Sequence, residues 1–389
     1  MPRTASVLAT HSTQAAVASM VGELTAGAQA ANARFGFLTC TVDVDVEGLR
    51  SGLAEALPGV AFLGATSCRS VIGSGQLLRG PHAAAALWLC GDVRGSVAAR
   101  AVSSADEAVG RLLAREALDG LGAGRTARFA IFQGTPSTEE PLLRGISPEL
   151  KGVPLLGGSA ADDDISGRWS IFTREARFPA GAALVVVDWP GKVATPYLSG
   201  AMPTELEGVV TRVEGRVIHE IDGRPAAEVY NEWLNGALDE ALHAGGVILG
   251  QTTLTPLGVV RSFGITLVHP ERILLPEKAI TTFAEVARGE RVTLVRSTKL
   301  GMQGRPANLV ARAMSEAGIA RDELKGVLLV YCAGCMLAID PATAAMVDSL
   351  RAVTGSAGVV GGFHFGEQGC PAPGRVVHGN LMTGALLLA

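Results

Sequence analysis

The chain has 389 residues, of which 48% are hydrophobic and 18% charged, so it can bury a large core, and its length suggests two or three domains. Its 33 basic and 37 acidic residues give a formal net charge of -4 with no block of like charge, so we expect no nucleic-acid partner. Apolar runs such as 83–89 and 182–187 are far shorter than the roughly 20 residues that span a bilayer, and we expect no membrane span.

The start of the chain lacks the continuous apolar stretch of a secretory signal. Its six cysteines are too sparse for a disulfide scaffold. Both observations predict a cytoplasmic protein with free thiols. Only Cys332 and Cys335 have a spacing that suggests a metal site or a redox pair.

A repeated unit begins with a helix-like stretch and an apolar run at 35–41. A second helix-like segment, a run at 60–64 that ends in glycine, a loop and a third run at 83–89 follow. The same order recurs with runs at 129–135, 153–157 and 182–187. Short buried runs that alternate with helices predict an α/β fold of repeated α-β-α-β-β units, with mixed sheets covered by helices.

We place a domain boundary after the second unit at Pro190 and Gly191, because proline and glycine directly after a strand indicate a turn or loop. It divides the chain into two predicted domains, 1–190 and 191–389. An insertion of about one unit's length, over 190–303, then precedes the third unit. Within it we expect a hairpin over 209–221, a helix over 225–238, and strands at 263–268 and 291–296.

The third unit opens with a helix whose first turn holds Pro306 and which ends at Gly318. Apolar side chains recur between them at helical spacing, which indicates a face packed on the core. Apolar runs follow at 327–333, 357–361 and 384–388. These runs complete the third copy of the unit.

The chain resembles the paired N- and C-terminal domains of the F-box and intracellular signal transduction family, called FIST. The segments that carry the resemblance are FLGATSCRSVIG (62–73), LLGGSAADDD (155–164), EGRVIHEIDGRPAAEVY (214–230), VHPERI (268–273), VLLVYCAGC (327–335), VVGGFHFGEQG (359–369) and VVHGNLMTGALLL (376–388). One loop departs from the family pattern, because His364 and Phe365 stand where threonine and tyrosine are expected before Gly366 and Glu367. This difference points to a different ligand.

The resemblance implies a FIST N-terminal domain over 1–190 and a FIST C-terminal domain over 191–389. It also implies an intracellular sensor of a small molecule, because such domains are commonly joined to output modules. We recognise no output module in this sequence and expect a separate partner, such as a histidine kinase or a cyclic-dinucleotide enzyme. Some relatives bind haem and respond to nitric oxide, which makes a haem gas sensor an alternative function.

Ligands of α/β sheets bind beyond the carboxyl ends of parallel strands, where the loops diverge. The repeated strands therefore predict a ligand site among the small and polar residues at their ends. These candidates are Ser67, Cys68, Gly157, Gly158, Ser159, Asp162, Cys332, Cys335, Gly362, His364 and Glu367.

Two groups of candidates have a structural alternative. The glycine pairs at 157–158 and 361–362 permit positive φ and close backbone approach, so they could present amides to an anion or form tight turns. The acidic run 162–164 could bind a cation or a ligand amine, or it could cap a turn.

The pattern Cys332-x-x-Cys335, with His364 and Cys370 in the same unit, has the residue types of a metal site or a redox pair. Buried, inert thiols are the alternative. A Cys–His nucleophile oriented by Glu367, or a metal held by the same cluster, would make the protein a thiol- or metal-dependent enzyme that uses Cys332 and Cys335 with His364 and Glu367. We favour binding over catalysis, because nothing in the spacing fixes their geometry.

A haem group would need an axial histidine or cysteine beside an apolar slot. The axial candidates are His219, His269 and His364. Because the sequence contains no CxxCH motif, covalent haem attachment is excluded.

Overall fold

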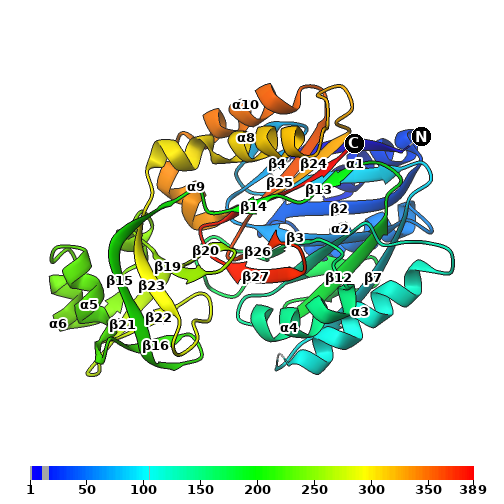
Figure 1. Cartoon of the computed structure of the whole chain (residues 1–389). Helices are drawn as coiled ribbons and strands as arrows, with labels where there is room; N and C mark the ends of the chain where they lie inside the picture. The colour runs from blue at the N-terminus through cyan, green and yellow to red at the C-terminus, as the bar shows by residue number, and fades with distance from the viewer. Residues whose placement is uncertain (1, 11–16, 105) are drawn as a thin grey trace.

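Three sheets surround one core in the computed structural model, which describes residues 2–10, 17–104 and 106–389 (Figure 1). In each sheet two parallel strands are joined through a helix, and a third strand runs antiparallel to the first. Phe37, Ile131 and Val330, one from the first strand of each unit, share the central core. The predicted fold class of repeated units with mixed sheets and covering helices is confirmed.

The first sheet carries helices α1 (Val17–Ala31) and α2 (Val46–Ala56) on its outer face. Its strands in spatial order are β1 (Arg3–Thr10), β6 (Ala83–Cys90), β2 (Ala33–Thr41), β3 (Ala61–Ser67), β10 (Ile171–Thr173) and β11 (Arg177–Phe178). Helix α2 begins where Asp45 Oδ1 accepts the Gly48 N–H at 3.0 Å. This hydrogen bond satisfies one of the free amides of the first turn.

The second sheet is covered by α3 (Glu107–Leu121) and α4 (Glu139–Leu150). Its strands in spatial order are β27 (Arg375–Gly379), β26 (Glu367–Ala372), β9 (Leu155–Ser159), β8 (Phe129–Gly134), β12 (Gly181–Asp188) and β7 (Arg94–Ala101). The strand β7 was not predicted, because its alternating burial leaves no continuous apolar run.

The third sheet is covered by α8 (Lys299–Glu316) and α10 (Thr343–Thr354), and the short α9 (Ala333–Ile339) follows its first strand. Its strands in spatial order are β13 (Val193–Ala194), β28 (Thr383–Leu388), β24 (Gly326–Cys332), β25 (Gly358–His364), β4 (Ser70–Gly73) and β5 (Gln76–Arg79). A further strand, β14 (Tyr197–Leu198), pairs with β28.

Helix α8 begins at Lys299, so the prediction that Pro306 lies in its first turn is wrong. Thr298 caps the true start by accepting the Gly301 N–H at 3.0 Å. The proline deprives the Met302 carbonyl, four residues earlier, of its helical donor, and the Tyr331 hydroxyl donates to that carbonyl instead at 2.9 Å. None of the described helices, α8 included, has the length and apolar character that crossing a bilayer requires.

The predicted loop after each second strand is in fact a hairpin that joins the sheet of another unit. The hairpin β4–β5 of the first unit pairs with β25, β10–β11 of the second pairs with β3, and β26–β27 of the third pairs with β9. The three units therefore exchange hairpins in a closed cycle. Local sequence gave no sign of this exchange, because each hairpin finds its partner strand far away in the chain.

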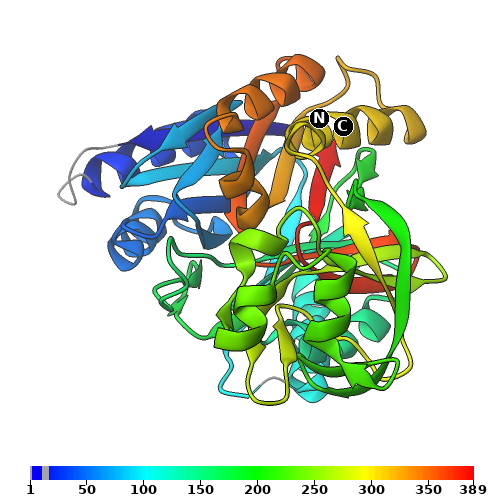
Figure 2. The ribbon, with the colours of Figure 1, turned by 90° about the vertical axis from the view of Figure 1, so that its left-hand side faces the viewer.

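The insertion, residues 202–296, forms one antiparallel sheet, and in Figure 2 the insertion faces the viewer with its helices in front. Its strands in spatial order are β18 (Gly246–Val247), β21 (Pro270–Leu274), β22 (Ala279–Thr282), β16 (Val217–Ile221), β15 (Met202–Glu214), β23 (Arg291–Arg296), β19 (Leu257–Arg261) and β20 (Gly264–Val268), and β17 (Arg224–Pro225) pairs with β16. Its helices are α5 (Ala226–Trp233), α6 (Asp239–Ala244) and α7 (Leu249–Thr252). The predicted helix over 225–238 is thus shorter, and a separate helix follows it.

Residue 190 lies between β12 and β13, where the chain passes from the second sheet to the third. The hairpin β26–β27 completes the second sheet, and β4–β5 completes the third. Segments 1–190 and 191–389 therefore complete each other's sheets, and the division between them remains a prediction.

Candidate functional site

A pocket of about 500 Å³ lies where the third unit, the loop after β9 and the insertion meet. Its volume falls within the roughly 300–1,000 Å³ that is typical of small-molecule sites. The three units outside the insertion, which we call the body, contribute several residues to the wall. These are Cys68, Asp163, Asp164, Cys332, His364 and Asn380. The insertion contributes Leu249, Gly250, Leu254, His269 and Phe283.

Three predicted ligand-binding residues, Cys68, Cys332 and His364, line this pocket together with the haem candidate His269. Cys332 and His364 are register neighbours on the parallel strands β24 and β25. Cys68 reaches the same place because its backbone N–H donates to Phe363 O on β25 at 3.0 Å. The carboxyl ends of strands from two units thus meet at one site.

The two pocket histidines are buried, with exposed fractions of 5% for His269 and 3% for His364. Burial lowers the pKa of each imidazole to about 4, so both rings are neutral at pH 7. One ring nitrogen of each faces a carbonyl oxygen, Leu249 O for His269 Nε2 and Ser159 O for His364 Nδ1, both at 3.2 Å. If that nitrogen carries the proton, the other nitrogen is left with a lone pair.

The glycine pairs serve close packing, and the expectation that they form turns or adopt positive φ is wrong. Gly157, Gly158 and Gly362 lie inside strands, and their backbones pair with β26 and β4. A Cβ at Gly158 would lie 2.6 Å from His364 Nδ1. Glycine at position 158 therefore gives the imidazole room to lie against the strand.

Asp162 organises its own loop and does not line the pocket. Its carboxylate accepts the backbone N–H of Ile165 at 2.6 Å and of Gly167 at 2.8 Å. Its neighbours Asp163 and Asp164 reach the pocket wall instead. The acidic run thus contains one turn-forming residue followed by two that face the pocket.

The two predicted serines are buried within the structure and do not line the pocket. Ser67 Oγ donates to Ser70 O at 2.6 Å and accepts the Phe363 N–H at 2.8 Å. Ser159 Oγ donates to Glu139 Oε1 at 2.5 Å. Ser67 thus connects the first unit to the third, and Ser159 Oγ connects the second to the third because it also accepts a hydrogen bond from Gln368 Nε2 at 3.1 Å.

A buried polar layer lies directly behind Cys332. It contains the predicted residues Cys335 and Glu367, neither of which lines the pocket. Glu367 Oε2 accepts the Met382 N–H at 2.9 Å, while burial raises the pKa of this carboxyl well above its ordinary value. Arg305 reaches the layer from α8 and lies 3.9 Å from Cys335 Sγ.

The histidine and cysteines do not form a catalytic triad with Glu367. Among the described residues no hydrogen bond joins His364 to Cys332 or to Glu367. Cys370 lies on β26, where its sulfur accepts the Leu155 N–H at 3.3 Å. His219, on β16, is not part of the pocket wall.

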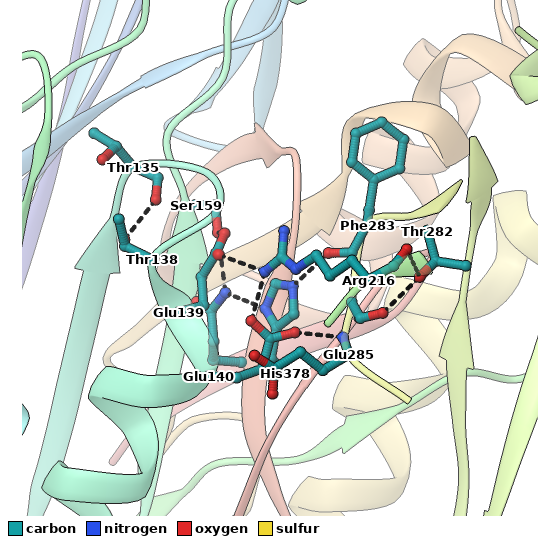
Figure 3. A network of polar contacts seen from close by, with 12 residues as sticks. Thr135, Thr138, Glu139, Glu140, Ser159, Arg216, Thr282, Phe283, Glu285 and His378 are labelled. Carbon is teal, nitrogen blue, oxygen red and sulfur yellow. Dashed lines mark hydrogen bonds and ion pairs between the residues drawn. The ribbon is translucent and has the colours of Figure 1, made fainter. Parts of the chain in front are cut away.

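A second polar cluster joins the insertion to the second unit (Figure 3). Within the part of the chain that the structure describes, only Glu139, Glu140 and His378 bring three potential metal-ligand atoms within 4.8 Å of one another. Arg216 Nη2 already occupies this place, with hydrogen bonds to Glu139 Oε2 at 2.8 Å and Glu140 Oε2 at 2.5 Å. We call these four residues the clamp.

Phe283 connects the clamp to the pocket. Its side chain lines the pocket, and its carbonyl oxygen lies 3.2 Å from His378 Nε2. A larger cleft of about 1130 Å³ lies beside the clamp, but charged pairs such as Arg144–Glu285 at 2.7 Å and Arg261–Glu290 at 3.0 Å occupy its walls. The smaller pocket is therefore the candidate site.

Several pocket residues could not be identified from the sequence. Phe283, Leu249 and Leu254 come from the insertion and follow no recognisable motif. Arg305, which lies in the polar layer behind the pocket, did give a signal, because a charged residue interrupts the apolar face of α8 between Met302 and Leu309. A charge at a core-facing helical position needs a buried partner.

Comparison with known proteins adds three findings. Models of the FIST N domain and the FIST C domain match residues 34–224 and 226–370. A stretch of 176 residues is 27% identical to an uncharacterized protein of Methanocaldococcus jannaschii, covering 43% of this chain but only 31% of that protein. The crystal structure of a cyanuric acid hydrolase from A. caulinodans aligns with 100% of this chain and 99% of that chain, at 14% identity and a TM-score of 0.37.

Proposed function

The chain belongs to the FIST family, and on that premise we propose that it is a cytoplasmic sensor that binds a small molecule in the 500 Å³ pocket and signals through a separate partner. FIST domains are associated with signal transduction and small-ligand sensing. A histidine kinase or a cyclic-dinucleotide enzyme is the class of partner that we propose.

One observation carries the proposal: the pocket wall is divided between the body and the insertion. Cys332 and His364 belong to the body, while Leu249, His269 and Phe283 belong to the insertion. A molecule bound there contacts both parts and stabilises the arrangement in which they meet. A difference in affinity between two such arrangements is what a sensor needs.

The chemistry of the wall favours an organic ligand with a few hydrogen-bonding groups. Apolar side chains such as Leu254 and Phe283 alternate with the neutral imidazoles and the Asn380 amide. Such a wall is typical of small-molecule sites, where a few polar groups fix the orientation of a mostly apolar ligand.

The test is a thermal-shift screen of small metabolites, followed by calorimetry, with two matched glycine variants. Gly250 lines the pocket, and a Cβ added there meets no atom within 4 Å. Gly22 also lies in a helix with open space around it, but it is not part of the pocket wall. A ligand at 100 times its dissociation constant should stabilise the wild type and Gly22→Leu by about 2.7 kcal/mol, and Gly250→Leu should lose this effect. If the ligand stabilised Gly22→Leu and Gly250→Leu equally, it would bind outside this pocket.

A haem-based gas sensor is the second candidate, and His269 is the observation that favours it. Its imidazole is neutral, lines the pocket and has one nitrogen held by a carbonyl oxygen, as metal-binding histidines usually do. Haem would supply an iron centre that binds a diatomic gas. A Soret band that disappears in His269→Ala would support this candidate, and a colourless protein after haem reconstitution would rule it out.

A further inference from the structure

Arg305 is a buried cation without a carboxylate partner. Its exposed fraction is 3%. Among the described residues its hydrogen bonds go only to Leu381 O, at 2.6 Å, and to Cys335 Sγ, at 3.9 Å, while Nε and Nη2 have no partner. A buried guanidinium requires a nearby negative charge, because an unpaired charge in the interior is strongly destabilising.

Cys335 is the group that can supply this charge. For the other acid nearby, Glu367, burial and Cys332 beside it raise the pKa of the carboxyl well above its ordinary value and so disfavour its charged form. Burial opposes ionisation of Cys335 too, but Cys332 and then Arg305 outweigh it, and the pKa of Cys335 falls below its ordinary value. Arg305, 3.9 Å from the sulfur, therefore favours the thiolate form of Cys335.

Cys332 connects this thiolate to the pocket. It is the N-cap residue of α9, and Cys335 is the third residue of the same helix. Residues with this spacing at a helix start hold their Cα atoms about 5–6 Å apart, which is the separation that a disulfide spans. Cys332 lines the pocket, whereas Cys335 is covered completely.

We propose that Cys332 and Cys335 form a redox-active dithiol that hydroperoxides oxidise to a disulfide after they enter the pocket. This inference uses the pocket of the proposed function as its route of access. It does not require that the pocket also binds another ligand.

The reaction balances with the hydroperoxide as oxidant. Cys332 passes its proton to the Cys335 thiolate, and its sulfur attacks the terminal peroxide oxygen, which releases an alcohol and leaves Cys332 as a sulfenic acid. Cys335, deprotonated again as the leaving alkoxide takes up its proton, then attacks the Cys332 sulfur. The hydroxide that leaves takes a proton from solvent and becomes water, so one thiol, one thiolate, one proton and one hydroperoxide give one disulfide, one alcohol and one water.

Oxidation removes the negative charge that balances Arg305. Glu367 is the remaining acid beside it, and its Oε1 has no hydrogen-bond partner. We expect Glu367 to ionise in the oxidised protein. Because Arg305 also binds Leu381 O, next to the pocket residue Asn380, the redox state is linked to the shape of the pocket wall.

The test treats the reduced full-length protein with cumene hydroperoxide, blocks free thiols by alkylation and maps disulfides by mass spectrometry. We expect a Cys332–Cys335 disulfide that forms at least about tenfold faster than oxidation of the half-buried Cys370, because Cys332 lines the pocket and has Cys335 beside it to take up its proton as it attacks. Cys370→Ser is the matched control and should leave the rate unchanged. Cys335→Ala removes both the base and the resolving thiol, so it should form the Cys332 sulfenic acid more slowly and stop there, where dimedone traps it.

Two further variants separate the possible failures. Arg305→Met should slow disulfide formation at least about tenfold, because it removes the cation that favours the Cys335 thiolate. Circular dichroism checks the fold of this variant. If Arg305→Met is unfolded, Cys335→Ala provides the test instead. Gly250→Leu should slow oxidation by cumene hydroperoxide. Free Cys332 and Cys335 thiols in a protein whose Cys370 is oxidised would overturn the proposal. The ligand screen above uses the reduced protein, so its outcome is independent.

Discussion

The insertion meets the body of the protein at two places with opposite chemistry. At the clamp, Arg216 is matched by Glu139 and Glu140, and both carboxylates are hydrogen-bonded to it. In the pocket, two neutral histidines line a space of about 500 Å³. The comparison indicates that the clamp fixes the insertion in place, while the pocket leaves room for a ligand to act.

The largest expected effect would break the clamp. Arg216→Met leaves two buried carboxylates without their cation, and breaking a buried ion pair in this way destabilises a protein by about 3–5 kcal/mol. Urea denaturation measures the change. Arg212→Met is the matched control, because Arg212 pairs with Glu220 at 2.9 Å on the exposed surface, where such pairs contribute about 0–1 kcal/mol. Equal losses in the two variants would contradict the role of the clamp.

The second effect concerns the pocket and acts through pH. Burial lowers the pKa of His269 and His364 from 6.5 to about 4, so the unfolded chain binds more protons than the folded protein between these values. Stability is therefore complete above pH 6.5 and falls as the pH decreases towards 4, by roughly 3 kcal/mol for each histidine. His269→Gln and His364→Gln should each flatten the dependence of unfolding free energy on pH. A slope that neither variant changes would show that these rings are solvated.

The smallest effect sharpens the description of the clamp. Glu285 donates its backbone N–H to Glu140 Oε1 at 2.6 Å, while its half-buried side chain pairs with the exposed Arg144 at 2.7 Å. Glu285→Gln keeps the backbone hydrogen bond and removes only a solvent-screened pair, so we expect a loss below about 1 kcal/mol. Thermal unfolding measures it. A loss of stability as large as that caused by Arg216→Met would show that the exposed Arg144–Glu285 pair also holds the insertion in place.

The unit order could be predicted from the sequence because buried strands leave continuous apolar runs such as 129–135 and 327–333. The meeting of Cys332 and His364 could be predicted too, since both end parallel strands of one unit. The polar hairpins gave no such signal, because their partner strands come from other units. The environments of Phe283 and His378 arise only when the insertion packs against the body, and no local pattern contains them.

The exchange of hairpins has a consequence for how the chain reaches its native state. The Phe363 N–H donates to Ser67 Oγ, 296 residues away in the sequence. The sheet of each unit is complete only after a hairpin from another unit has paired with it. Closing such distant contacts is slow because much chain entropy is lost before they form. We therefore expect slow refolding, and at high concentration two unfolded chains can trade hairpins with each other and form a domain-swapped dimer. The closed cycle that completes the three sheets within one chain also provides the route to that dimer.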